Sequence, residues 1–134
     1  MTRYYDIDEA NAALPDVERI LLALRDQRGE LIRLRDQVIE AQASSRGGPT
    51  GTASDTRTLR LRMQFLIDQM QAGVSQLVEQ DVTLREIEAG LIDFPALASG
   101  RQVWLCWRLG EGPIEYWHEM EDGFAGRRRL ADLT

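Results

Sequence analysis

The sequence predicts a mainly α-helical protein with a small β component, an α+β fold. We expect a long antiparallel helical hairpin with a C-terminal β-hairpin packed against it. Two stretches repeat apolar residues every seven positions, as is typical of long helices that pack along a narrow seam. Gly, Pro, Ser and Thr separate these stretches at residues 44–55. The third observation is the segment 101–119, which is rich in aromatic and β-branched residues.

The composition favours one domain, residues 1–134, and restricts the classes of partner. A net charge of −6 and a pI of about 4.8 argue against nucleic-acid binding. No apolar run approaches the roughly 20 residues that span a bilayer, so no membrane contact is expected. The N-terminus lacks an apolar signal core and the single cysteine cannot form an internal disulfide. We therefore expect a cytoplasmic protein.

The first helical region covers residues 6–43. Asp6 and Glu9 have the spacing of a capping box at a helix start. Pro15 suits the first turn of a helix better than its interior, so we expect the helical region to break there. The long helix that follows carries its apolar seam at Val17, Leu24, Leu31 and Val38.

The second long helix is expected at residues 56–89, after a flexible linker at residues 44–55 that has nothing to bury. Gly90 is placed to end this helix. The seam resumes at Met63, Met70, Leu77 and Leu84.

Apolar residues also lie beside the two seams, Ile67 and Val74 among them. A short β-hairpin cannot cover helices of this length, and exposed apolar patches tend to mark interfaces. We therefore expect a homodimer through the long helices, similar to a coiled coil, because two-fold pairing is the commonest form of self-association.

The segment 101–119 is predicted as a β-hairpin, and residues 120–134 as a tail. The turn residues "GEGP" divide two strand-like stretches, "VWLCWRL" and "IEYWHE". With a two-residue turn, Arg108 faces Glu115, and the opposite charges support this register. Cys106 and His118 then project from opposite faces.

The single cysteine and the single histidine are the residues with the richest chemistry. A catalytic dyad needs the two groups within about 3 Å. The predicted register separates them, so no catalytic residue is predicted. His118 with carboxylates would instead suit a divalent metal such as manganese, iron or zinc. The alternative is a hydrogen-bonded histidine at a strand end among solvated acids, and no other cofactor is expected. The candidate ligands are His118, Glu119, Asp93 and Glu88.

Several motifs are specific enough to compare with a known family. They are "CWRLGE", which begins at Cys106, "WH", which ends at His118, and "GFAGR", which ends at Arg127. The stretches "GLIDFP" and "YDIDEANAALP" also fit. Together they resemble the bacterial domain-of-unknown-function family 2203 (DUF2203) over nearly the whole chain. That family carries no established activity, so the resemblance implies no mechanism.

The matching positions concentrate charged groups, which a hairpin needed only for packing would not require. These groups form either a ligand pocket or a buried ion-pair network. Arg127 also opens a run of arginines on an acidic protein, which could bind an anion or neutralise nearby acids. The residues of the candidate anion or ligand site are Arg101, Arg108, Glu111 and Arg127.

Three functions remain open from the sequence. The leading hypothesis is a non-enzymatic helical interaction module that self-associates. The alternative is a metal- or anion-binding protein with a site around His118, Asp93, Glu119 and Arg127. A third is an enzyme that uses Cys106, which the lone cysteine and the opposed faces disfavour.

Overall fold

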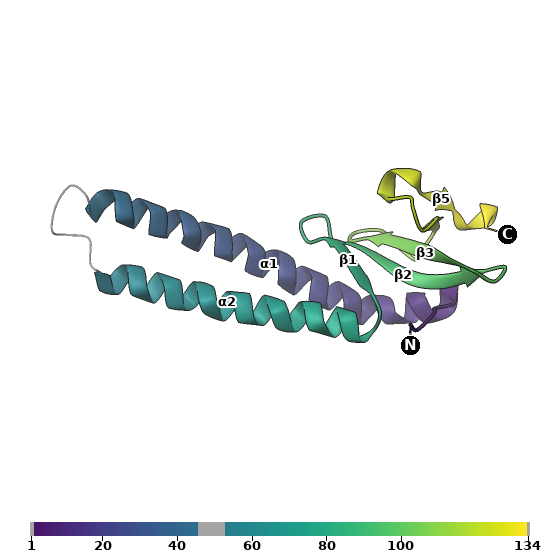
Figure 1. Ribbon diagram of the computed structural model, residues 1–134, viewed down its shortest axis with the longest axis horizontal. Coiled ribbons are helices and arrows are strands. Elements are labelled where there is room, and N and C mark those ends of the chain that lie inside the picture. Colours follow the sequence, from purple (N-terminus) through teal and green to yellow (C-terminus); the bar gives the residue numbers. More distant parts are fainter. Residues whose placement is uncertain (1, 46–52, 134) are drawn as a thin grey trace.

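The computed structural model describes residues 2–45 and 53–133, and the predicted α+β class is confirmed (Figure 1). Two long helices, α1 (Ile7–Ser45) and α2 (Ala53–Glu79), run antiparallel, side by side. A five-stranded sheet lies at the end of the pair where α1 begins and α2 ends. The middle of the linker predicted at residues 44–55 lies outside the described residues, and both of its ends belong to the helices.

Helix α1 begins with the predicted capping box. The backbone N–H of Glu9 donates to Asp6 Oδ1 at 2.7 Å, and the N–H of Asp6 donates to Glu9 Oε1 at 3.1 Å. The predicted break at Pro15 is wrong, because α1 continues through it. A proline has no N–H to give to the carbonyl of Asn11, one turn earlier. The packing of α1 on the sheet therefore outweighs that lost bond.

Helix α2 ends at Glu79, ten residues before the predicted end at residue 89. The N–H of Val82 donates to Leu77 O at 3.0 Å, and the N–H of Asp81 donates to Val78 O at 2.9 Å. This is a Schellman motif, with Asp81 in the left-handed conformation (φ 59°) that glycine usually takes. Gly90 does not end a helix; it lies in a turn between two strands.

The sheet is larger than the predicted hairpin. Its order is β1-β2-β3-β4-β5, and every neighbouring pair is antiparallel. The strands are β1 (Thr83–Glu86), β2 (Leu91–Ala98), β3 (Arg101–Arg108), β4 (Tyr116–His118) and β5 (Arg128–Arg129), with short 3-10 helices η1 (Phe124–Gly126) and η2 (Leu130–Asp132).

The tightest hairpin joins β2 to β3 and was not predicted. Ser99 and Gly100 form its two-residue turn, both with positive φ (52° and 82°), as a type I′ turn requires. Pro95 is tolerated inside β2 because β1 pairs only with Leu91–Asp93. Beyond β1, the carbonyl of Pro95 instead accepts the N–H of Tyr5 at 2.8 Å.

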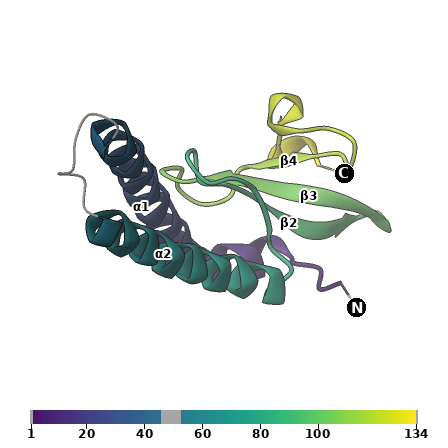
Figure 2. The same ribbon diagram turned by 60° about the vertical axis from the view of Figure 1, so that its left-hand side comes forward.

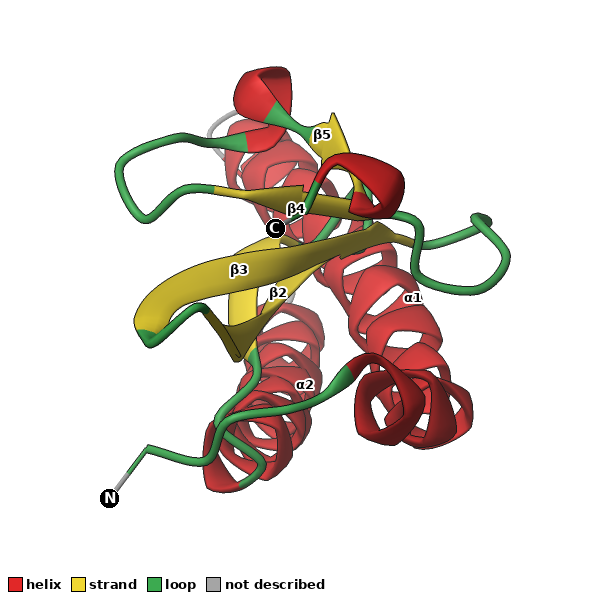
Figure 3. Cartoon of the chain, turned by 90° about the vertical axis from the view of Figure 1, so that its right-hand side faces the viewer, coloured by secondary structure: helices red, strands yellow, loops and turns green. Residues whose placement is uncertain are grey.

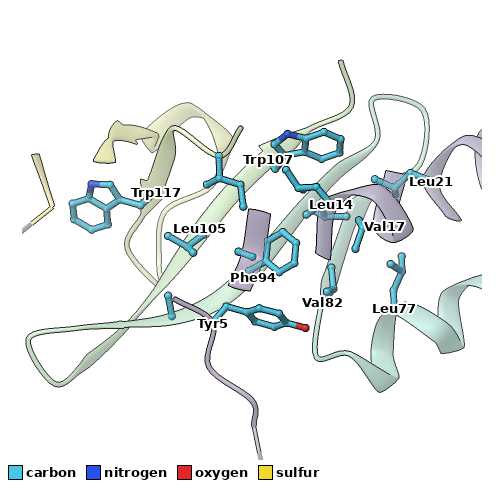
Figure 4. Close-up of a cluster of buried hydrophobic side chains, with 14 of the residues drawn as sticks. Tyr5, Leu14, Val17, Leu21, Leu77, Val82, Phe94, Leu105, Trp107 and Trp117 are labelled. Atoms are coloured by element: carbon cyan, nitrogen blue, oxygen red, sulfur yellow. The ribbon is translucent and has the colours of Figure 1, made fainter. Parts of the chain in front are cut away.

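The hydrophobic core lies between the helices and one face of the sheet (Figure 4). Phe94 is fully buried and meets the ring of Tyr5 edge to face, with centroids 4.9 Å apart. The apolar seam of α1 contributes to this core near the end of the two helices that meets the sheet. Leu34 and Val38 are buried farther along α1. Core residues labelled in Figure 4 include Leu14, Val17, Leu21, Leu77, Val82, Leu105, Trp107 and Trp117.

After β4 the chain turns back on the side of the sheet away from the long helices, and β5 then joins the edge of the sheet beside β4 (Figures 2 and 3). One face of the sheet therefore packs against α1 and α2, residues 120–124 line a cavity on the other face, and Leu130 and Leu133 pack against the core. Within residues 2–45 and 53–133, no helix is both long enough and apolar enough to cross a membrane.

Candidate functional site

Three buried residues from three neighbouring strands share the face of the sheet opposite the helices. Asp93 on β2 pairs directly with Cys106 on β3, and antiparallel partners point to the same face. His118 on β4 pairs with Trp104, two residues before Cys106 on β3, and so also points to that face. Neighbouring positions such as Ile92 point into the core, so strand alternation brings the polar residues together.

The three residues form one compact cluster. Asp93, Cys106 and His118 are each 1% exposed. Each offers one possible ligand atom, and these atoms lie within 4.8 Å of one another. Among the described residues, this is the group of three or more His, Cys, Asp or Glu side chains whose ligand atoms lie close enough together to hold a metal ion.

The prediction that Cys106 and His118 project from opposite faces of the hairpin is wrong, as the observed register between β3 and β4 shows. Cys106 pairs with Tyr116, one residue away from the predicted alignment. Because side chains alternate with period two, a shift of one residue moves the whole strand to the other face. The observed register also places Trp117 in the core.

The connection between β3 and β4 explains the shift, because it is a long loop and not a two-residue turn. The indole N–H of Trp107 donates to Gly112 O at 2.9 Å, and the N–H of Ile114 donates to Asn11 Oδ1 at 2.8 Å. The N–H of Arg108 donates to Glu111 Oε1 at 2.7 Å. These bonds to the indole, to α1 and to the glutamate hold the loop open.

His118 has an acceptor oxygen against each ring nitrogen. Its Nδ1 lies 2.9 Å from the carbonyl oxygen of Glu119, and its Nε2 lies 3.0 Å from Asp93 Oδ2. A neutral imidazole carries one N–H and can donate to only one of them. One of the two contacts therefore has no proton from the neutral ring, unless a second proton or a cation lies between Nε2 and Asp93.

Only one of the two carboxylate oxygens of Asp93 has a hydrogen-bond partner among the described residues. Its Oδ2 accepts the Nε–H of Arg85 at 2.8 Å and also faces His118. Its Oδ1 is buried and has no hydrogen-bond partner among the described residues. A buried carboxylate oxygen without a strong partner is costly, and the Cys106 thiol, which faces Asp93 across the two strands, is only a weak donor.

Cys106 lies between groups of opposite charge. Burial raises the pKa of its thiol to about 12; the carboxylate of Asp93 also raises it, and the guanidinium of Arg127 opposes the rise. A thiol with this pKa is not an activated nucleophile at neutral pH, which disfavours an enzyme that uses a cysteine thiolate. Arg127 Nε is itself buried without a hydrogen-bond partner among the described residues.

A cavity of about 400 Å³ opens over the cluster. Arg85 on β1 lines this cavity, and so do Met120 and Phe124 in the segment after β4. The other lining residues are Leu91, Asp93, Cys106, His118, Glu121, Asp122 and Gly123.

Two of the predicted metal ligands lie with other partners. Glu119 Oε1 is 2.5 Å from Arg101 Nη2, and Glu88 Oε2 is 3.0 Å from Arg28 Nη1 on α1. Neither carboxylate belongs to the cluster of converging ligand atoms, whereas Cys106 does.

The residues of the predicted anion site also divide between two places. Arg127 Nη2 binds Glu111 Oε1 at 2.6 Å, and the Arg127 guanidinium stacks 3.9 Å from the ring centre of Tyr116. The Arg108 guanidinium lies 5.8 Å from the ring centre of Phe124. Arg101 is paired elsewhere, with Glu119. Arg127, Glu111 and the ring of Tyr116 thus form an ion-pair and stacking cluster that holds the C-terminal segment against β4 and the loop after β3.

Sequence reasoning missed Arg85, because residues 83–86 were assigned to a helix. The signal was present: Val82 and Thr83 are β-branched and begin a strand after the Schellman turn. In a strand beside β2, Arg85 can reach across to Asp93.

Comparison with known proteins agrees with the motifs and adds no activity. The family model for DUF2203, described as an uncharacterized conserved protein, matches residues 3–130. No curated protein and no solved structure matches the chain. The matched range includes both helices, all five strands and the cluster, so the protein belongs to the DUF2203 family.

Proposed function

We propose that this protein binds a divalent transition-metal ion, with zinc the best fit, through Asp93, Cys106 and His118. The observation that carries the proposal is the buried Oδ1 of Asp93, which has no hydrogen-bond partner in the described chain and belongs to a cluster with a thiol and an imidazole. Thiolate, imidazole and carboxylate are the ligands that zinc takes in proteins. Magnesium and calcium prefer oxygen ligands alone.

A bound ion would satisfy the cluster atom by atom. Asp93 would coordinate through Oδ1 and keep Oδ2 on Arg85, which is 2.8 Å away. His118 would coordinate through Nε2 and keep Nδ1–H on the carbonyl of Glu119. That arrangement, with the second nitrogen on a carbonyl, is usual for metal-binding histidines.

Cys106 would lose its proton to the ion and coordinate as a thiolate, because a bound cation overrides the pKa of a buried thiol. The thiolate would then accept a stronger, charge-assisted hydrogen bond from Arg127, which already interacts with the Cys106 side chain. Ligand atoms around a tetrahedral zinc stand about 3.5 Å apart, given bond lengths of 2.0–2.3 Å. The cluster spans at most 4.8 Å and needs only small side-chain rotations to close.

The test is metal analysis of protein purified without an affinity tag, followed by reconstitution with cobalt. We expect one ion per chain and the intense near-ultraviolet band of a cobalt–thiolate bond. Cys106→Ser should abolish that band, and His118→Gln should remove most of the metal. Glu88→Gln, an exposed acid outside the cluster, is the matched control and should bind cobalt normally.

The competing explanation is a structural ion-pair network of Arg85, Asp93 and a protonated His118. In that case zinc would not raise the unfolding free energy, whereas specific binding adds about 2.7 kcal/mol at a hundredfold excess over Kd. A Cys106→Ser variant that binds cobalt as the parent does would also overturn the proposal. Circular dichroism of each variant separates loss of metal from loss of fold.

We propose self-association through the helices as a second function, and exposed apolar side chains on α2 support it. Leu61 and Phe65, one helical turn apart, are 63% and 56% exposed. Light scattering should give twice the chain mass of 15.2 kDa, and Phe65→Glu should reduce it to a monomer. Leu97→Glu, at an exposed position on β2, is the control. A mass of one chain at every concentration would contradict the proposal.

A further inference from the structure

The proposed metal site has three protein ligands, which leaves a position for an exchangeable ligand. Within the part of the chain that the structure describes, Asp93, Cys106 and His118 are the side chains that converge. Structural zinc sites are closed by four protein ligands. Sites with three keep the fourth position for water or a bound molecule.

The cavity shows where that position points. All three cluster residues line the same cavity of about 400 Å³, so an ion held between them presents its remaining side to that space. Met120 and Phe124, both partly exposed, lie on its wall in the segment after β4. A cavity of this size is at the lower end of the range for small-molecule sites.

Arg85 supplies an anchor for an anion beside the ion. Its Nε is held by Asp93, and the guanidinium lies 5.0 Å from the ring centre of Trp104. The two terminal nitrogens make no hydrogen bond to other described residues, and 41% of the side chain is exposed. A guanidinium fixed at one edge, with both terminal nitrogens free, can donate charge-assisted hydrogen bonds to a carboxylate oxygen that is held beside it.

The charges around the fourth position favour a ligand that carries a single negative charge. Among the groups that would touch the ligand, a divalent ion is neutralised by the Asp93 carboxylate and the Cys106 thiolate, and Arg85 leaves one positive charge. Arg127 is already neutralised by Glu111. Glu121 and Asp122 also line the cavity and disfavour an anion with a second negative charge, such as hydrogen phosphate.

We infer that the site binds a small carboxylate, with one oxygen on the metal's fourth position and the other on the guanidinium of Arg85. This inference rests on the proposed metal site and adds the class of its ligand. The carboxylate comes from a small molecule that fits the cavity.

The experiment is a titration of the cobalt-loaded protein with acetate, followed by the visible absorption bands of cobalt. We expect saturable changes in position and intensity, as a ligand exchanges at the fourth position. Arg85→Gln should still bind cobalt but weaken acetate at least tenfold. Arg28→Gln, at an arginine on α1 that is paired with Glu88, is the matched control and should leave acetate binding unchanged. Phosphate at the same concentration should perturb the bands less than acetate.

The outcomes separate the two proposals. If no cobalt binds to the parent protein, the metal site itself is wrong. If cobalt binds through the cysteine but neither acetate nor phosphate changes its spectrum, the site is closed and this inference fails alone. Phosphate that binds as tightly as acetate would overturn the assignment of a monoanion. Acetate binding that survives in Arg85→Gln would remove Arg85 from the site.

Discussion

Arg127, just before β5, binds Glu111 in the loop that joins β3 to β4, with 2.6 Å between Nη2 and Oε1. The same carboxylate oxygen accepts the backbone N–H of Arg108 at 2.7 Å. Burial on its own would raise the pKa of Glu111, but these two hydrogen bonds and the two positive charges outweigh it, so the pKa is lowered from 4.5. The ionised carboxylate therefore stabilises the folded state.

Replacing Glu111 by Gln should reduce the unfolding free energy at neutral pH by about 2 kcal/mol, typical of hydrogen bonds to charged groups. Because the pKa in the folded state is lowered, the contribution is present above pH 4.5 and is lost as the pH falls below it. The deficit of the variant should therefore shrink in acid. Urea unfolding across this range measures it, with the exposed Glu115→Gln as control. If the variant's loss of unfolding free energy were unchanged in acid, the ionised carboxylate of Glu111 would not be what stabilises the folded state.

Gly90→Ala should be strongly destabilising. Gly90 has φ +63°, and an added Cβ would lie 2.5 Å from the Cβ of Leu109, with which Gly90 shares a backbone hydrogen bond. Gly100 also has positive φ (+82°), but its added Cβ would meet nothing within 4 Å. Both variants bear the backbone cost of about 1 kcal/mol, and only Gly90→Ala adds the clash. Equal melting temperatures for the two variants would show that the strands near Leu109 shift freely.

Phe94→Ala should remove about 3–5 kcal/mol of unfolding free energy, because the ring is fully buried against Tyr5 and a cavity remains. Leu97→Ala, three residues along β2 at an exposed position, should change it by less than about 0.5 kcal/mol. Denaturant unfolding of both variants checks the prediction. A small effect at Phe94 would place the core elsewhere.

Asp6→Ala should cost about 1 kcal/mol, because it removes the acceptor for the N–H of Glu9 at the start of α1. Asp6→Asn keeps an acceptor oxygen and should lose much less. Thermal unfolding followed by circular dichroism distinguishes them. Equal losses in the two variants would mean that the charge of Asp6, and not the cap, stabilises the helix.

The sequence predicted local features well where one short-range rule decides them. The capping box of Asp6 and Glu9 involves residues three positions apart, so the pattern contains all the information. The seam of α1 was found for the same reason, since helical periodicity brings Val17 and Leu24 to one face. The end of α2 was missed because Asp81 takes the conformation that glycine signals, and no residue type marked the stop.

The α+β class, the apolar seam of α1 and the choice of His118 and Asp93 as candidate site residues were thus determined by the sequence alone. The register of β4 on β3 was decided only by the tertiary structure, because Asn11 on α1 and the indole of Trp107 hold the connecting loop open. Local charge pairing favoured an alignment one residue away, and alternation in a strand turns that single step into the opposite face. Long-range contacts therefore decided whether Cys106 and His118 lie apart or form one site with Asp93.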